Sequence, residues 1–188
     1  MQINIEQTSI NDVKVIVPEV FRDDRGFFSE VYRSDQFSDL DLPTNFVQDN
    51  QSGSGSGVIR GLHFQWEPPM GKLIGVTVGK VFLVAVDIRK NSPTLGNWVG
   101  LEVSAENRKM LWAPAGFARG MCPLADYSEI QYKCTGLYNK NCESNILWND
   151  PDIGIKWPIK NPLISERDKN AKTFKEWLQT PESDNFRY

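Results

Sequence analysis

The chain has 188 residues, of which 40% are hydrophobic and 24% are charged, a balance that is typical of a soluble globular protein. Its net charge of -3 at pH 7 argues against a general binder of nucleic acids or membrane surfaces, because such binding needs concentrated positive charge. We therefore expect one domain over residues 1–188 whose partner is a small molecule.

Short runs of β-forming residues recur along the chain, each bounded by glycine, proline or asparagine. They occupy residues 13–17, 26–33, 58–65, 73–78, 80–88, 98–103, 109–113 and 128–135. This pattern predicts an all-β fold, a sandwich or jelly-roll barrel, with 80–88 as a central strand because both of its faces are apolar. The Gly79-Lys80 junction predicts a tight hairpin, and the glycine- and serine-rich stretch 53–57 predicts a loop.

Only the C-terminal part of the sequence has a helical pattern. Ser165 and Asp168 have capping-box spacing ahead of apolar residues at helical intervals in 171–178. We expect a short amphipathic helix here that packs on the sandwich or on a partner subunit.

The chain starts without a basic segment and a long apolar run, so no secretory signal is expected. The longest apolar run, VFLVAV, is far shorter than the roughly 20 residues that span a bilayer. Cys122, Cys134 and Cys142 form an odd set without C-x-x-C spacing, which indicates reduced structural thiols. These features predict a cytoplasmic protein without a membrane partner.

His63 is the one histidine in the sequence, and it limits the chemistry that the chain can perform. Transition-metal sites use clusters of histidine, cysteine and carboxylates, so we expect no metal. A G-x-S-x-G motif is absent, which argues against a Ser-His-Asp hydrolase. His63 is left with proton transfer, ligand binding or packing. In a regular strand it would lie on the face opposite to Arg60.

Ordered motifs from about residue 8 to residue 170 closely resemble the dTDP-4-dehydrorhamnose 3,5-epimerase family. They are DDRGFFSEVY (23–32), FVQDNQS (46–52), VIRGLHFQ (58–65), GKLIGV (71–76), VAVDIRKNSPTLGNWVG (84–100), VSAEN (103–107), WAPAGFARG (112–120), YKCTGLY (132–138), ILWNDPDIGIKWP (146–158) and ISERD (164–168). The resemblance implies a jelly-roll (cupin-like) homodimer that needs no metal or other cofactor, with sites partly shared between subunits. It also implies a role in deoxysugar biosynthesis for a polysaccharide or a decorated metabolite.

The reaction that the resemblance implies is proton abstraction beside a ketone. A nucleotide-diphosphate 4-keto-6-deoxysugar has acidic hydrogens at C3 and C5, because deprotonation there gives an enolate on the C4 oxygen. Inverting either carbon requires a base on one face of the sugar and an acid on the other face.

By similarity, His63 is the base and Asp168 pairs with it to fix its tautomer and stabilise the imidazolium. Local sequence alone favours a different role for Asp168, as a capping carboxylate, and the two roles are hard to combine. Tyr132 matches the opposing acid, or else it is an aromatic strand residue. Lys72 matches a cation that stabilises the enolate, or else it is a solvated turn lysine.

Further residues match substrate-binding positions of the family. They are Arg25, Glu30, Gln48, Asn50, Arg60, Arg119, Tyr138 and Glu143. Arginine suits the pyrophosphate, and Tyr138 either stacks on the nucleotide base or packs in the core. The region of Arg25 and Glu30 commonly reaches the partner subunit's site in the family.

Three positions depart from the family's motifs. Arg119 stands where typical members have the histidine of GFAHGF, Leu83 where they have the aspartate of VFDVAVD, and Gly75 where many have arginine. In the family that histidine and aspartate form a second charged pair beside the sugar. We therefore expect a site remodelled on one side, with epimerase chemistry retained but its regiochemistry or substrate altered.

Two alternatives stay open at this point. The chain could be a non-catalytic cupin that binds a nucleotide sugar as a scaffold or sensor, although such a binder has no need of an opposed acid and base. It could also be a cupin 3,4-ketoisomerase, whose motifs fit the ordered blocks less well.

Overall fold

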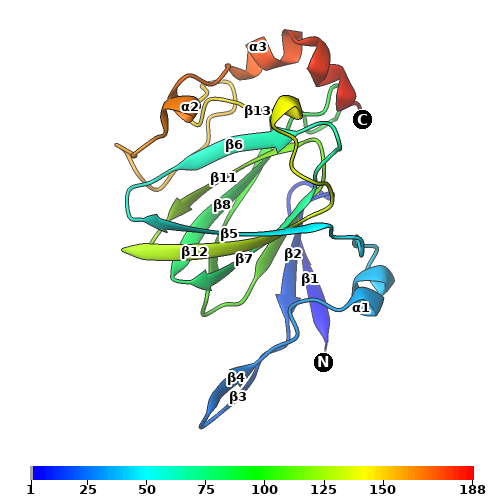
Figure 1. The fold of residues 1–188 in the computed structure, drawn as a ribbon, viewed down its shortest axis with the longest axis vertical. Helices are drawn as coiled ribbons and strands as arrows, with labels where there is room; N and C mark the ends of the chain where they lie inside the picture. The colour runs from blue at the N-terminus through cyan, green and yellow to red at the C-terminus, as the bar shows by residue number, and fades with distance from the viewer. Residues whose placement is uncertain (1) are drawn as a thin grey trace.

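The computed structural model describes residues 2–188, and within them two antiparallel sheets face each other (Figure 1). One sheet has six strands in the order β1 (Ile3–Gln7), β2 (Lys14–Pro18), β10 (Met110–Ala113), β7 (Lys72–Val78), β12 (Tyr127–Cys134) and β5 (Gln48–Gly55). The other has five, in the order β13 (Glu143–Asn145), β6 (Arg60–Gln65), β11 (Phe117–Pro123), β8 (Lys80–Asp87) and β9 (Trp98–Ser104). The predicted all-β jelly-roll class is confirmed.

The main core fills the space between the two sheets, because alternate residues of each strand point inward. Ile74 and Val76 of β7 meet Leu83 and Ala85 of β8 in this cluster. The other face of β8 is also buried, and its Val84 packs in a second cluster. The prediction of an interior strand that is apolar on both faces is therefore confirmed.

The C-terminal segment covers the outer face of the five-stranded sheet, where Phe174, Trp177 and Phe186 pack with Phe64 (Figure 1). Instead of one predicted helix there are two, α2 (Glu166–Lys169) and α3 (Phe174–Gln179), with a 3-10 helix, η2 (Pro181–Asn185), after them. The capping box forms at Thr173 and Glu176 of α3, because Thr173 starts the helix that carries the apolar face. No helix within residues 2–188 has the length and apolar character needed to cross a membrane.

Outside the two sheets, β3 (Phe21–Asp23) and β4 (Gly26–Phe28) form a separate hairpin that extends away from the sandwich (Figure 1). The predicted strand over 26–33 is thus wrong beyond Phe28. A helix that the sequence pattern missed, α1 (Ser34–Asp39), follows, and its Phe37 is buried on the outer face of the six-stranded sheet. A short 3-10 helix, η1 (Lys140–Cys142), precedes β13.

Two local predictions are wrong. β7 and β8 do not form a hairpin, because Gly79, at a φ of +71°, turns the chain from one sheet into the other. The 53–57 stretch is not entirely a loop, since Gly53–Gly55 continue β5 and pair with Glu129–Tyr127 of β12. A Cβ at Gly53 would lie 2.1 Å from the Tyr127 hydroxyl, so a larger residue there would push the exposed Tyr127 side chain aside.

Candidate active site

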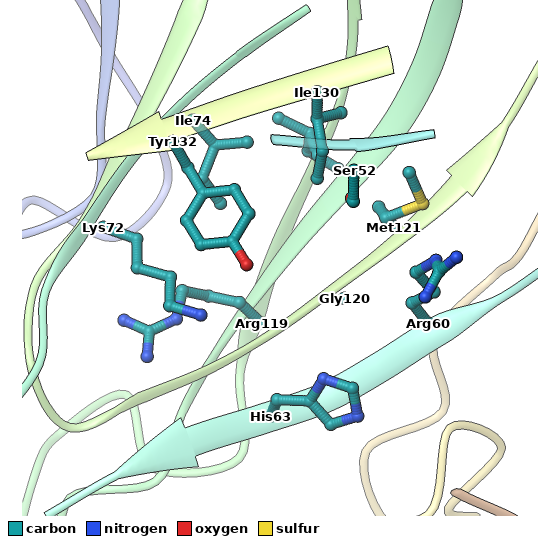
Figure 2. A pocket seen from close by; sticks show the side chains of 11 residues that line it. Ser52, Arg60, His63, Lys72, Ile74, Arg119, Gly120, Met121, Ile130 and Tyr132 are labelled. Carbon is teal, nitrogen blue, oxygen red and sulfur yellow. The ribbon is translucent and has the colours of Figure 1, made fainter. Parts of the chain in front are cut away.

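Two adjoining cavities of about 170 and 150 Å³ open between the sheets, and Figure 2 shows the residues that line the first of them. Four side chains line both of them: His63, Lys72, Arg119 and Tyr132. The first cavity continues toward apolar residues such as Ile74 and the second toward polar residues of β5 and β13. The four shared side chains therefore mark the place where the two cavities meet.

His63 and Tyr132 enter this space from opposite sheets. His63 lies on β6 opposite Arg119 of β11, and Tyr132 lies on β12 opposite Asn50 of β5. Figure 2 shows the Tyr132 hydroxyl and the His63 ring reaching into one cavity from facing sides. A flat molecule bound between them would present one face to an imidazole and the other to a phenol.

A bulge in β6 places Arg60 in the same cavity as His63. His63 pairs with Arg119 and Arg60 pairs with Met121, so β6 contains one residue more than β11 between these points. The placement of Arg60 and His63 on opposite faces was predicted for a regular strand, and it does not hold because β6 is not regular here. Gly61, at a φ of +142°, is needed in the bulge because a Cβ there would lie 2.6 Å from the Cα of Gly120.

His63 is held by a buried carboxylate. Its Nε2 lies 2.7 Å from Oδ1 of Asp168, whose side chain is 3% exposed. Asn145 Nδ2 also donates to this carboxylate, at 3.0 Å, and the amide of Gly61 at 3.4 Å. Burial by itself would raise the pKa of Asp168, but the hydrogen bond from His63 and the other contacts outweigh it and hold the pKa below its ordinary value.

The two roles predicted as competing for Asp168 are both filled. Ser165 is the N-cap of α2, and its hydroxyl accepts a hydrogen bond from the backbone amide of Asp168. The cap uses only the main chain of Asp168, so its carboxylate stays free to bind His63. The prediction that one role would exclude the other was wrong for this reason.

Lys72 is not a solvated turn lysine. Its ammonium lies 4.6 Å from the centroid of the Tyr132 ring, and burial, with a smaller contribution from the charge of Arg119, lowers the pKa of Lys72 to about 8. Burial also raises the pKa of Tyr132 above its ordinary value. Tyr132 therefore keeps its proton at neutral pH and can act as an acid.

Most of the predicted substrate-binding residues lie around these cavities. Gln48, Asn50, Tyr138 and Glu143 line the second cavity, and Arg60 lines the first. The Tyr138 side chain is not packed in the core, because it is 55% exposed and its hydroxyl donates to Glu143 at 2.7 Å.

Arg25 and Glu30 are the exceptions. Arg25 lies in the extended β3–β4 hairpin, where its side chain is 90% exposed, and neither residue lines the cavities described above. If Arg25 and Glu30 contribute to a binding site, that site is not the cavity of their own chain.

A protein-family model described as dTDP-4-dehydrorhamnose 3,5-epimerase matches residues 7–176. The chain belongs to this family. A dTDP-4-dehydrorhamnose 3,5-epimerase of Shigella flexneri is 50% identical over 173 residues, which cover 91% of this chain and 96% of that protein. One of Neisseria gonorrhoeae is 49% identical over 96% of this chain, although the match spans only 54% of that longer protein.

Solved structures agree with this membership. The dTDP-6-deoxy-D-glucose-3,5-epimerase of Legionella pneumophila, in complex with dTDP-4-keto-L-rhamnose, has a TM-score of 0.94 and 41% identity to this chain, covering 100% of it and 99% of that protein. The prediction from the sequence motifs, of an isomerase that epimerises a nucleotide-linked sugar, is confirmed.

Of the three departures from the epimerase motifs, two lie in the cavity. Leu83 and Arg119 both line it, whereas Gly75 lies on the opposite face of β7, beside Met110. The prediction that all three remodel one side of the site is therefore wrong for Gly75. Neighbouring strand residues face opposite ways, so Gly75 cannot share the side of Lys72 and Ile74.

Sequence reasoning missed three polar residues in or beside this candidate site. Asn145 orients Asp168, Arg167 forms an ion pair with Glu143 at 2.8 Å, and Ser52 lines the first cavity. Arg167 lies inside the recognised ISERD motif, so its position next to Asp168 could have indicated it. Nothing in the local sequence of Asn145 points to a contact with a residue 23 positions away.

Proposed function

We propose that this chain inverts one or both of the carbons beside the keto group, C3 and C5, of a dTDP-linked 4-keto-6-deoxyhexose. The observation that carries the proposal is the entry of His63 and Tyr132 into one cavity from opposite sheets. Removing and returning a proton on the same face would restore the starting sugar. Inversion needs two groups on opposite faces, and a protein that only binds a sugar does not.

In this mechanism His63 takes the proton from the carbon, and the electron pair of the C–H bond moves onto the keto oxygen as an enolate. The carboxylate of Asp168 stabilises the imidazolium that forms. Lys72 stabilises the enolate oxygen. Tyr132 then returns a proton to the opposite face of the carbon, and exchange with water restores the neutral histidine and the phenol.

Polar residues around the cavities would hold the nucleotide. Arg60 suits the pyrophosphate, because a guanidinium binds phosphate oxygens in a bidentate manner. Tyr138 suits the base, since its ring is exposed and its hydroxyl is held by Glu143, which is held in turn by Arg167. Gln48 accepts a hydrogen bond from the amide of Tyr138 at 2.8 Å and so fixes the ring further.

The protein would act as a homodimer with shared sites. Support comes from the β3–β4 hairpin, which extends away from the sandwich (Figure 1) and carries Phe21, Phe27 and Phe28 with exposures of 47, 48 and 59%. Exposed aromatic residues gathered on one projection are typical of an interface. A partner subunit covered by this hairpin would receive Arg25 and Glu30 near its own cavity.

We assign the protein to the cytoplasm. All three cysteines within residues 2–188 are free thiols, and two of them, Cys122 and Cys134, are buried, which suits a reducing compartment.

Exchange of substrate hydrogens with solvent tests the proposed reaction. In D₂O with dTDP-4-keto-L-rhamnose, proton NMR should show loss of the signal at C3, at C5 or at both. His63→Asn should slow this exchange about 10²- to 10⁴-fold, because it removes the base. Its affinity for dTDP, measured by calorimetry, should not change.

Two results would count against these assignments. If the wild-type enzyme exchanges neither hydrogen, the proposed reaction is wrong, and a shift of the carbonyl from C4 to C3 would identify a ketoisomerase instead. If His63→Asn exchanges hydrogens at the wild-type rate, His63 is not the base.

A further inference from the structure

Arg119 is a buried cation without a carboxylate partner. Its residue is 5% exposed, and it takes part in none of the ion pairs within residues 2–188. Its hydrogen bonds all start from Nη1 and go to backbone carbonyls, that of Met70 at 2.8 Å and those of Ala113 and Pro114 at 3.4 Å. Its Nε is buried with no partner in the described chain. A buried charge in this condition is costly unless an anion joins it.

The three carbonyls fix the guanidinium in place at the reacting centre. Arg119 is one of the four residues that line both cavities, and the other three are the proposed base, acid and enolate-stabilising cation. In Figure 2 the Arg119 guanidinium lies beside the end of the Lys72 side chain. Burial lowers the pKa of Arg119 to about 10, so it remains charged at neutral pH.

Lys72 also lacks a carboxylate partner among the described residues. Its contact is the face of the Tyr132 ring, and the carboxylate in the second cavity, Glu143, is already bound by Arg167 and Tyr138. Two neighbouring cations repel each other, and the Arg119 charge, after burial, is a cause that lowers the pKa of Lys72, whereas Cys134 and Glu143 act in the opposite direction. The repulsion between the two cations is relieved when negative charge forms between them.

We propose that Arg119 is a second enolate-stabilising catalytic residue, which shares with Lys72 the negative charge that develops on the keto oxygen when His63 removes the proton. This inference rests on the proposed function. The reaction creates that charge only transiently, so a preorganised pair of cations favours the enolate over the neutral ketone. The guanidinium also stays charged at a pH where Lys72 has lost its proton.

The rate of exchange as a function of pH separates the two cations. For the wild-type enzyme between pH 7 and 9, the rate should fall through about pH 8 as Lys72 is deprotonated, and then approach a plateau that Arg119, with its pKa of about 10, maintains. Arg119→Gln should lower kcat at pH 7 about 100-fold with little change in dTDP affinity. In Arg119→Gln the pKa of Lys72 should rise, because Lys72 no longer faces a second cation. The fall in rate that accompanies deprotonation of Lys72 should therefore occur above pH 8.

Arg119→Lys keeps a cation in place but makes it titratable. The Arg119→Lys enzyme should regain much of the wild-type rate at pH 7, and near pH 9 its rate should fall far below the wild-type plateau. If Arg119→Gln does not fold, the pH profile of Arg119→Lys still tests whether Arg119 stabilises the enolate. Arg89→Gln is the matched control, since Arg89 is a well-buried arginine paired with Asp87 outside the cavities. It should lower the melting temperature and leave kcat unchanged.

The inference is overturned if Arg119→Gln keeps the wild-type kcat and pH profile, or if Arg119→Lys keeps the wild-type plateau. It also fails if the wild-type enzyme shows no plateau above pH 8. Each of these results leaves the proposed reaction intact as long as the wild-type enzyme still exchanges substrate hydrogens. Loss of wild-type exchange instead removes both the proposed function and this inference.

Discussion

The carboxylate of Asp168 shapes what His63 can do. A lone imidazole in a cavity can rotate and exchange tautomers, and a carboxylate at 2.7 Å from Nε2 removes both freedoms. The carboxylate is in turn held by Asn145 and by the amide of Gly61. The proposed base is thus positioned by contacts from β6, β13 and α2, and each contact restricts the orientation of the His63 ring.

Asp168→Asn should therefore impair catalysis without removing the base itself. An amide presents no negative charge to the imidazolium and can stabilise the wrong tautomer, so kcat for hydrogen exchange should fall about 10²- to 10⁴-fold. The affinity for dTDP should stay the same. Glu166→Gln, an exposed carboxylate on the same helix, is the control and should keep the wild-type rate. A wild-type rate for Asp168→Asn would show that the pair is only structural.

The residues of the candidate site could be identified from the sequence, but the contacts between their side chains could not. His63, Lys72, Tyr132 and Asp168 were recognised from motifs, and the structure brings all four together at the cavities. The contact between His63 and Asp168 joins residues 105 positions apart, and only tertiary structure creates it. The burial that lowers the pKa of Lys72 is likewise a property of the folded protein.

The bulge in β6 brings Arg60 and His63 to one side of the sheet. Two residues, Gly61 and Leu62, face the single residue Gly120 across the strand pair, and the side-chain pattern shifts by one. The close approach of the two backbones leaves no space for a side chain at position 61. A local irregularity therefore places a cation suited to phosphate in the same cavity as His63.

Gly61→Ala should destabilise the protein more than an ordinary glycine substitution. Its Cβ would meet the Cα of Gly120 at 2.6 Å, and backbone atoms cannot move aside as a flexible side chain can. We expect the free energy of unfolding, from urea titration, to fall by about 3 kcal/mol or more, since strained φ and a steric clash add together. Hydrogen exchange on the sugar should also slow.

Gly26→Ala is the matched control for this experiment. Gly26 has a similar φ of +130°, but a Cβ there would find no atom within 4 Å. It should lose only the cost of the unusual backbone conformation, about 1 kcal/mol. Equal losses at the two positions would show that the contact with Gly120 does not matter.

The positions of strands with a clear apolar pattern, such as β8, were predictable, whereas β1 and β11 were missed and strand pairing was not predictable. The residues around Gly79 have the same local sequence whether β7 and β8 pair as a hairpin or pass from one sheet to the other. The choice depends on partners far along the chain, β12 for β7 and β11 for β8. The same limit applies to β5, where backbone hydrogen bonds to β12 make a strand of residues whose composition resembles a linker.

The sandwich as a whole explains why a base and an acid can stand opposite each other. β6 and β12 belong to different sheets, so side chains that point inward from each strand meet across the space between the layers. At one end that space is filled by the apolar core, and at the other end it stays open as the two cavities. Separate layers hold the two groups apart, and the packed core keeps the distance between them fixed.

The β3–β4 hairpin contacts its own sandwich through Arg22, which donates to the carbonyl of Glu106, and through Phe27, whose ring lies 3.6 Å from the Arg108 guanidinium. Phe21 and Phe28 of the hairpin stay about half exposed, which predicts a dimer. Phe28→Asp should weaken that dimer, because burial of a phenylalanine contributes about 1.5–3 kcal/mol, or roughly a 10- to 150-fold change in the dissociation constant. Sedimentation equilibrium measures this directly. The exchange rate per subunit should fall as dimers dissociate, since Arg25 and Glu30 would leave the partner's site. Leu163→Asp, at an exposed leucine outside the hairpin, should change neither the dissociation constant of the dimer nor the exchange rate per subunit. A fully active wild-type monomer would rule out the shared site.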